Sequence, residues 1–421
     1  MEDEEETQQI LKVLEALKQA SQELQTNPEA DSSESDSSSC AIKALLELDT
    51  ESDSLLSSDP NLSNLSHHLS DLRTLISSLH NSKHKHGRIK SFLTRRLKTH
   101  EITRVAESIE SEIQAWIDRE SITNLTSQLQ KIRSSESDLG SDEEDEVVEK
   151  LDQLHDRLSQ GFNINLQDLL LKSKIFSELE FLLCNCNASQ RVREKAGNAL
   201  KHVVLFNKDV FVGQILMGQT IKALVSMDSL CSLEVLTSLI KAIRSPLVDV
   251  IESVGGISKA ISYLNSEDLV MRVMAMEFIL EIGYFGRKEA VEAMLNCGLI
   301  KKLVELQRSE LGGDLIDLGK THQKFEDDDE EEEEEGVELK TTTTTKKKKK
   351  KKRYGEKRFL EKHPFASCVA RFTVQLEVGE GLRQREKRGF KQEILKKIRE
   401  ACDSDAEAAT IVAEVLWGSS P

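Results

Sequence analysis

The chain has 421 residues, a formal net charge of −17, 31% charged residues, 4% aromatic residues and five prolines. The acidic excess is concentrated in discrete tracts, so we do not expect nucleic acid as a partner. Seven cysteines, odd in number and scattered, exclude a disulfide framework and favour a reducing compartment. The length allows two or more domains, and the scarcity of aromatic residues and of strand-type alternation predicts an all-α protein.

Residues 1–60 are predicted to hold one amphipathic helix followed by a flexible region. Apolar residues recur at helical spacing between Thr7 and Leu24. The stretch Asp31–Ser39 is nearly all Ser, Asp and Glu, which bury too little apolar area to order a segment. The start of the chain lacks the features of a signal peptide, and no apolar run approaches the ~20 residues of a membrane helix. We therefore expect a cytoplasmic and/or nuclear protein.

Residues 61–160 are predicted to form a helical bundle. Apolar residues from Leu62 to Leu79 alternate between spacings of three and four, which is typical of a coiled-coil seam packing on a neighbouring helix. A polar break at Asn81–Gly87 follows, and further apolar stripes occupy residues 102–116 and 147–158. Together these stripes indicate four or five helices, with the Ser-, Asp- and Glu-rich stretch Ser134–Glu146 as a linker.

A basic segment within this bundle gives the sharpest local contrast in charge. Its cations are interleaved with apolar residues. On a helix, the cations would face an anionic lipid surface or an acidic partner, at about 1 kcal/mol for each cation near such a surface. The other interpretation is a solvated helix face held by its Leu and Phe residues. The candidate contacts are Lys83, Lys85, Arg88, Lys90, Arg95, Arg96 and Lys98.

Residues 165–320 carry an apolar pattern that recurs at a long and regular interval. Val192 and Leu233 are 41 residues apart, and Leu233 and Val273 are 40 residues apart. A second apolar series, which begins at Ile257, begins again at Leu299. A period of about 40 residues built from helices is typical of armadillo-like α-solenoids, which bind partners on an extended surface. The pattern predicts three long inner helices whose apolar stripes are Val192, Ala196, Ala199 and Val203; Leu233, Leu236, Ile240 and Ile243; and Val273, Met276 and Leu280.

Residues 321–358 are predicted to be a disordered charged insertion inside one repeat. Ten consecutive acids at Glu326–Glu335 precede five threonines and a basic run, and such blocks repel internally and stay solvated. The apolar pattern returns about 50 residues later than its period predicts, which is why we place an insertion here. The basic run has the composition of a nuclear localisation signal. The alternative is low-complexity drift, with internal pairing of the run to the adjacent acids. Its residues are Lys346, Lys347, Lys348, Lys349, Lys350, Lys351, Lys352 and Arg353.

Residues 359–421 are predicted to complete the last repeat and to end in a cap helix. The returning stripe is followed by a second helical stripe and then by a capping box, Ser404-x-x-Glu407. Gly418 is expected just past the end of the last helix. The two apolar stripes are Phe365, Val369, Phe372 and Leu376, and Phe390, Ile394 and Ile398.

The repeat register resembles that of the armadillo family. Gly256-Ile257 and Cys297-Gly298-Leu299 open equivalent segments, and the resemblance covers about residues 165–320 and 360–417. It implies repeats of three helices stacked in a right-handed superhelix. The stretches Phe365–Phe372 and Arg385–Leu395 are similar to plant armadillo-repeat proteins in which a helical domain precedes the repeats, an arrangement shared with plant U-box ubiquitin ligases.

Two departures from that family limit what the resemblance implies. Residues 120–190 contain neither the Cys-Pro loop nor the Thr-Tyr-Asp/Glu-Arg motif of a U-box, so intrinsic ligase activity is not expected. Trp116 and Trp417 are the only tryptophans and lie outside the central repeats. The Trp-x-x-x-Asn ladder with which importin-α proteins bind basic peptides is therefore not expected.

The sequence predicts a non-enzymatic scaffold or adaptor that binds protein partners. No catalytic constellation, cofactor or small-molecule substrate is indicated, and His202 is expected to be structural or exposed because no Cys or Ser partner lies near it in the sequence. The alternatives are a membrane-associated signalling or immune-type protein acting through the basic bundle, and a substrate adaptor of the ubiquitin pathway. The residues expected to face a partner are Glu234, Lys241, Arg272, Glu277 and Glu281.

Overall fold

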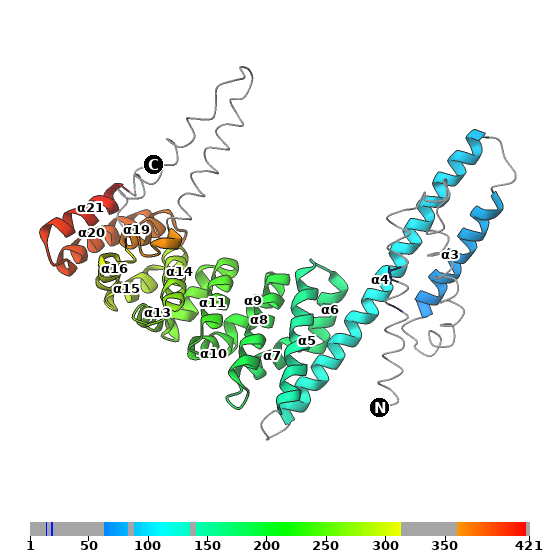
Figure 1. Ribbon diagram of the computed structural model, residues 1–421, viewed down its shortest axis with the longest axis horizontal. Helices are drawn as coiled ribbons and strands as arrows, with labels where there is room; N and C mark the ends of the chain where they lie inside the picture. Colours follow the sequence, from blue (N-terminus) through cyan, green and yellow to red (C-terminus); the bar gives the residue numbers. More distant parts are fainter. Residues whose placement is uncertain are drawn as a thin grey trace, which may run out of the picture. The chain divides into compact units, whose positions relative to one another are not determined.

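The computed structural model describes residues 14, 18, 19, 63–82, 88–134, 140–312 and 360–417. Every regular element in these ranges is a helix, as predicted for an all-α protein, and the described part contains no strand (Figure 1). The chain divides into two compact units, residues 1–131 with 163–175, and residues 132–162 with 176–421. No described helix is both long and apolar enough to cross a membrane.

The first unit contains α3 (Ser63–Ser82), most of α4 (Arg88–Ser134) and α6 (Ile164–Ser173). The predicted polar break falls between α3 and α4. Three residues of the predicted seam, Leu65, Leu69 and Leu72, are buried in α3, as expected for residues that pack on a neighbouring helix. In α4, a long stripe at spacings of three and four is also buried, and Leu14 is fully covered. The buried side chains of α3 and of the middle of α4 are Leu65, Leu69, Leu72, Ile102, Ala106, Ile109, Ile113 and Trp116.

The second unit is a succession of packed helices. Their bounds are α5 (Ser141–Ser159), α7 (Ile175–Cys184), α8 (Gln190–Phe206), α9 (Lys208–Met217), α10 (Thr220–Ser226), α11 (Leu230–Ile243), α12 (Ser245–Ser253), α13 (Gly256–Tyr263), α14 (Leu269–Phe285), α15 (Lys288–Asn296), α16 (Leu299–Arg308), α19 (Cys368–Val378), α20 (Gln384–Ala401) and α21 (Asp405–Trp417).

Helix α5 begins earlier than the sequence predicted. Ser134–Glu146 was expected to be a linker, but α5 is helical from Ser141. Its first turn carries three acids, which are favourable at the positive end of a helix dipole, and Glu143 accepts a hydrogen bond from the Gly140 amide. The helix packs against α8 in the second unit, although its apolar stripe was grouped with the bundle. The domain limits as a whole stay a prediction.

The long helices α5, α8, α11, α14 and α19 form a row in which each packs against the next (Figure 1). From α8 onwards, two shorter helices separate successive members: α9 and α10, then α12 and α13, and then α15 and α16. This arrangement of three helices per period confirms the predicted armadillo-like α-solenoid. We name these five helices the long-helix row.

The predicted apolar stripes are buried in α8 and α11, but of the stripe predicted in α14 only Met276 is buried. Val273 is 37% exposed, whereas Ala275, Met276 and Ile279 are buried. Helix α14 is apolar on nearly all sides, so its period alone does not identify the face that packs inward.

Two repeats open with the same backbone feature. Gly255 and Gly298 have φ values of 77° and 79°, a left-handed conformation that glycine adopts without steric cost, directly before α13 and α16. The equivalent helix α10 opens differently. Glu180 of α7 accepts hydrogen bonds from the backbone amides of Gln219 and Thr220 at 2.7 and 2.9 Å. A carboxylate from a neighbouring helix therefore caps α10.

The last repeat is interrupted between α16 and α19. Helix α19 packs on α14 and α16, although residues 313–359 intervene in the sequence. The predicted stripes of α19 and α20 are buried, and the Glu407 amide donates to Ser404 Oγ at 3.2 Å, as the capping box predicts. Gly418 and the acidic, Thr and Lys blocks of the insertion lie outside the described residues.

Candidate protein-binding surface

One side of the long-helix row carries polar contacts that join α5 to α8, α8 to α11 and α11 to α14. Residues three, four and seven apart on a helix share a face, so each helix contributes a short series of side chains. We name these side chains the row surface. It comprises Asp152 and His155 of α5, Lys195, Asn198 and His202 of α8, Glu234 and Lys241 of α11, and Glu277 and Glu281 of α14.

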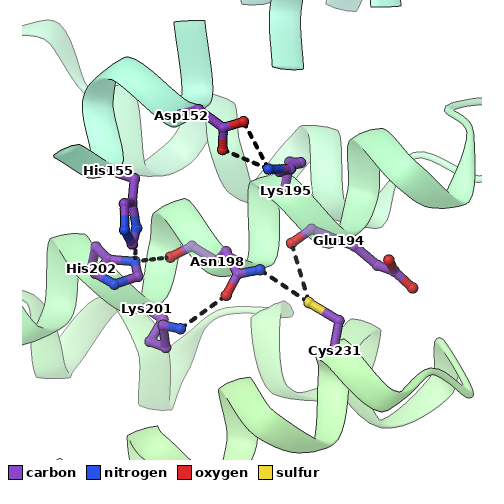
Figure 2. Close-up of polar contacts among 8 residues, drawn as sticks. All are labelled: Asp152, His155, Glu194, Lys195, Asn198, Lys201, His202 and Cys231. Atoms are coloured by element: carbon purple, nitrogen blue, oxygen red, sulfur yellow. Dashed lines mark hydrogen bonds and ion pairs between the residues drawn. The ribbon is translucent and has the colours of Figure 1, made fainter. Parts of the chain in front are cut away.

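Ion pairs join α5 to α8. Lys195 Nζ lies 2.6 and 2.7 Å from the two carboxylate oxygens of Asp152 (Figure 2). One turn earlier, Arg191 pairs with Asp145 at 2.6 Å. All four side chains are substantially exposed, and such pairs contribute about 0–1 kcal/mol each. Their main effect is therefore to orient charged groups on the row surface.

Two histidines meet where α5 and α8 cross. The Nδ1 atoms of His155 and His202 are 3.0 Å apart, and His202 Nδ1 is 2.7 Å from the Asn198 carbonyl oxygen (Figure 2). Because that oxygen only accepts, the geometry assigns the proton to His202 Nδ1 and leaves His155 Nδ1 as an acceptor. Burial lowers the pKa of His202, and the charge of Lys201 lowers it further, against the hydrogen bond to Asn198. The neutral imidazole of His202 is therefore the favoured form.

Asn198 connects α8 to α11. Its side-chain amide donates to Cys231 Sγ at 3.0 Å, and its side-chain oxygen accepts from Lys201 at 2.9 Å (Figure 2). Burial raises the pKa of the Cys231 thiol, and the Glu194 charge adds to the effect. The thiol therefore stays protonated and can donate to the Glu194 carbonyl oxygen, 3.8 Å away. Cys231 is a hydrogen-bonding group here and is not an activated nucleophile.

Three of the five predicted partner-facing residues lie together across α11 and α14. Lys241 Nζ is 3.1 Å from Glu277 Oε1 and 3.4 Å from Glu281 Oε1. Burial opposes the charge on Lys241, but the hydrogen bond that Lys241 donates to Glu277 and the charges of both glutamates outweigh it and raise the lysine pKa. Glu234 is exposed seven residues before Lys241, and therefore lies on the same face of α11. This cluster carries more negative than positive charge.

Arg272, the fifth predicted residue, is placed elsewhere. It precedes Glu277 by five residues, which is about 140° around a helix of 3.6 residues per turn. Its guanidinium carbon lies 5.7 Å from the centroid of the Phe365 ring, a cation–π arrangement. Arg272 therefore packs towards the interrupted repeat and does not share the row surface with Glu277.

Exposed valines adjoin the acidic cluster on α14. Val270 and Val273 are 55% and 37% exposed. They precede Glu277 by seven and four residues, so they share its face. An apolar patch next to paired charges is a common composition for a protein contact.

Sequence reasoning missed the contribution of α5 and α8 to this surface. The sequence does contain one indication of this contribution, because polar residues of α8 at spacings of three and four follow one another beside its apolar stripe. Its partners lie between 33 and 47 residues away in the sequence, so the sequence alone does not pair them. The residues missed are Asp152, His155, Lys195, Asn198 and Cys231.

The other predicted sites are not described at the level of side chains. Lys83 and Lys85 lie outside the described residues. Arg88, Lys90, Arg95, Arg96 and Lys98 belong to α4, but the structure describes only their backbone. The run Lys346–Arg353 also lies outside the described residues.

No family model and no curated protein matches the sequence. Among solved structures, a designed armadillo repeat protein matches with a TM-score of 0.40 and 13% identity, over 70% of this chain and 99% of its own. A designed armadillo repeat protein in complex with the peptide (KR)4 matches with a TM-score of 0.38 and 15% identity, over 70% and 99%. An engineered protein matches with a TM-score of 0.38 and 15% identity, over 97% and 98%. Similarity at this level adds nothing to the fold argument, which rests on the helices of the chain itself.

Proposed function

We propose that the second unit is a non-enzymatic scaffold that binds a protein partner along the row surface. The observation that supports this proposal is a continuous series of cross-helix polar contacts on one side of the long-helix row. It runs from Asp152–Lys195 through Asn198–Cys231 to Lys241–Glu277. These contacts hold charged and amide groups in fixed positions while leaving them accessible.

The spacing of the row fits an extended protein segment. Packed helices lie about 8–10 Å apart, and an extended chain rises about 3.3 Å per residue. A segment laid across the row therefore places about three residues over each helix. Every third side chain would meet a new helix, with the apolar Val270 and Val273 available beside the charged Glu277.

Photocrosslinking from the row surface tests the proposal. Ser238 lies on α11 between Glu234 and Lys241 on the same face, whereas Ser258 of α13 is exposed on a helix outside the row. We expect Ser238→p-benzoylphenylalanine to crosslink a defined protein in cells of the native organism. The matched Ser258→p-benzoylphenylalanine variant should not crosslink that protein. Equal crosslinking from both positions would contradict a binding surface on the row.

A charge-reversal pair sharpens the same test. Glu277→Lys changes the row surface, whereas Arg272→Glu changes a residue on the other side of the same helix. We expect Glu277→Lys to reduce recovery of the partner crosslinked from Ser238, and Arg272→Glu to leave it unchanged. Because breaking the Arg272 contact with Phe365 could loosen the last repeat, thermal unfolding of each variant is the control for folding.

Other interpretations from the sequence stay predictions, each with its own assay. Membrane association through the basic segment predicts that residues 1–131 co-sediment with liposomes only when anionic lipid is present.

A role as a substrate adaptor in the ubiquitin pathway predicts that the partner bound at the row surface is ubiquitinated less when this chain is absent. A nuclear signal at Lys346–Arg353 predicts that deletion of this run moves a tagged chain out of the nucleus.

A further inference from the structure

Helix α20 presents a cationic face on the side opposite its buried stripe. Arg385, Arg388, Gln392, Lys396 and Arg399 follow one another at spacings of three, four, four and three, so they lie on one face. Arg385, Arg388, Lys396 and Arg399 are exposed. On the other side of the helix, Phe390, Ile394 and Ile398 are buried. We name Arg385, Arg388, Lys396 and Arg399 the α20 cationic face.

The cations of this face have almost no partners, unlike their neighbours on the same helix. Lys387 donates to the carbonyl oxygens of Glu377 and Gly379 at 2.8 and 2.7 Å, and Lys391 pairs with Glu377. Within the described residues, Arg385, Arg388 and Arg399 form no ion pair, and Lys396 has only Glu400 at 3.8 Å.

Four like charges along one face repel one another in the absence of a counter-charge. Residues 384–401 contain seven Lys and Arg and three Asp and Glu, a net charge of 7 − 3 = +4 in a chain whose net charge is −17. The face is therefore an exception to the charge of the whole protein. Its chemistry suits an acidic occupant.

We propose that the α20 cationic face binds an acidic protein segment, and that this segment is the tract Glu326–Glu335 of the same chain. The surface consists only of described residues of α20, and the occupant is the ten-residue acidic run that follows α16 in the sequence. We choose this acidic run as the occupant because its charge is complementary to that of the face and because the chain tethers it to α16. The inference is independent of the proposed function, because no residue of α20 belongs to the row surface.

The length of the connecting chain allows this contact. Helix α16 packs directly on α20, and the described chain after α16 extends to Gly312, so that only positions 313–325 separate it from Glu326. A connection of about 14 residues spans roughly 20 Å as a coil. The face from Arg385 to Arg399 is about 21 Å long at 1.5 Å per residue, and ten residues extend over as much as ~33 Å. The tract can therefore reach the face and cover it.

Tethering favours the chain's own tract over a separate acidic peptide. A short link holds a segment at an effective concentration on the order of millimolar. The contact joins exposed charges, so it weakens as salt shortens the screening length from about 10 Å at 0.1 M to about 3 Å at 1 M. We therefore expect occupancy to be high at low salt and to fall as salt is added.

The test is fluorescence anisotropy of a labelled peptide with the sequence of residues 326–335, added to the full chain. In both chains compared, Lys346–Arg353 is replaced by Gln so that this run does not bind the peptide, and in the tract-neutral chain the ten acids of the tract are also replaced by Gln and Asn. At low salt, we expect the tract-neutral chain to bind the peptide at least ten-fold more tightly than the chain that keeps its tract, because that tract competes. Equal affinity for both chains would show that the tract is not the occupant and would overturn the proposal.

A second pair of variants, both made in the tract-neutral chain, locates the site. R385Q/R388Q/K396Q/R399Q removes the α20 cationic face, and K208Q/K222Q/K301Q/K362Q removes the same number of exposed cations elsewhere. Only the first should abolish peptide binding. Loss in neither variant, or in both, would overturn the assignment to α20. Circular dichroism should show both variants to be as helical as the parent.

Vesicles distinguish a membrane surface from an acidic segment. The tract-neutral chain is mixed with vesicles of phosphatidylcholine alone or with phosphatidylserine added. Binding to phosphatidylserine vesicles that R385Q/R388Q/K396Q/R399Q abolishes, without binding to the peptide, would assign the face to an anionic membrane and overturn the proposal. The expected result is peptide binding that these four substitutions abolish and vesicle binding that they leave unchanged.

Discussion

Two pairs of neighbouring helices in the long-helix row differ in how the chain connects them. We name the pair α11–α14 the contiguous junction and the pair α14–α19 the interrupted junction. Between α11 and α14 the chain runs without interruption, and only five residues, 264–268, separate α13 from α14. Between α14 and α19 the connection includes the long stretch 313–359. Loop closure costs about 0.6 kcal/mol for each doubling of length, so the longer connection costs about 2 kcal/mol more.

Among the described residues, the interrupted junction carries buried polar bonds that the contiguous one lacks. Gln307 of α16 donates to the carboxylate of Glu414 of α21 at 2.8 Å, and both are buried. The Gln307 side-chain oxygen accepts from the Val369 amide at 3.4 Å. A hydrogen bond to a charged group contributes about 1.5–3 kcal/mol, similar to the extra cost of the loop. Hydrogen bonds thus stabilise the last repeat, whereas short connections between helices stabilise the other repeats.

Removing Gln307 should have the largest effect. Gln307→Ala removes the donor to Glu414, which is only 4% exposed. We expect a loss of about 1.5–3 kcal/mol in the stability of the last repeat, because the buried carboxylate loses a hydrogen bond that water does not replace. In a solenoid such a loss is local. Hydrogen exchange should therefore accelerate in α19 and α21 and stay unchanged in α8 and α11.

Glu414→Gln separates the hydrogen bond from the charge. This variant keeps an oxygen that accepts from Gln307 but carries no charge, so it should lose less stability than Gln307→Ala. If both variants left the exchange rates of α19 and α21 unchanged, the polar contact would not hold the interrupted repeat together.

A pair of helical glycines compares the two kinds of junction by packing. A Cβ on Gly283 of α14 would lie 3.1 and 3.4 Å from ring carbons of Phe372 in α19, whereas one on Gly197 of α8 would lie 3.1 Å from a methyl carbon of Leu224. Alanine gains about 0.5–1 kcal/mol over glycine inside a helix. Both side chains are buried, but a methyl group of Leu224 can rotate aside, whereas the rigid ring of Phe372 cannot move without overpacking, which costs about 1–3 kcal/mol.

We therefore expect Gly197→Ala to be neutral or stabilising and Gly283→Ala to be destabilising, with a difference of about 1–2 kcal/mol. Urea unfolding of the two variants, followed by circular dichroism, measures it. Equal stabilities would mean that the α14–α19 interface accommodates an added methyl group as readily as the interfaces between contiguous helices.

The sequence predicted the framework of the row better than its surface. The apolar period placed α8, α11, α13 and α16 correctly because one face of each helix is buried and the rest is mostly polar. It failed for Val273, because α14 is apolar on most of its circumference and many registers satisfy the pattern.

Cross-helix partners were beyond the reach of the sequence. The pairing of His155 with His202 depends on the crossing of two helices 47 residues apart, and a local pattern carries no information about that crossing. Arg272 and Glu277 were expected on one surface for a different reason, because their spacing of five residues on one helix was not taken into account. Their separation around α14 follows from helix geometry, but the partner of Arg272, Phe365, lies beyond the insertion.

The surface part of the interrupted junction should respond to pH. Arg308 of α16 donates two hydrogen bonds to Glu407 of α21, both at 2.8 Å. The hydrogen bond from Arg308 is the main cause of a lowered Glu407 pKa, against the opposing effect of burial. Stability from this pair is therefore present above the ordinary glutamate pKa of 4.5 and is lost as the pH falls through the lower folded-state value.

Arg308→Gln should accordingly reduce the protection of α21 amides at neutral pH. The difference from the unmodified chain should shrink as the pH falls below about 4.5. Lys301→Gln changes an exposed cation on the same helix and is the control. A difference that stayed constant from pH 7 to pH 3 would show that Arg308 acts through packing of its side chain and not through the charge of Glu407.

The smallest effect is expected at the contiguous junction, from the pair Lys241–Glu277. Both side chains are about half exposed and lie 3.1 Å apart, and exposed pairs contribute about 0.2–1 kcal/mol. A double-mutant cycle with Lys241→Ala and Glu277→Ala should give a coupling energy at the low end of that range in 0.1 M salt, because Glu281 at 3.4 Å partly replaces Glu277 as a partner for Lys241. A coupling above about 1.5 kcal/mol, the scale of a hydrogen bond to a charged group, would make the contiguous junction as dependent on polar bonds as the interrupted one. In that case the directional contacts at Gln307 would be a general property of this row and not a response to the insertion.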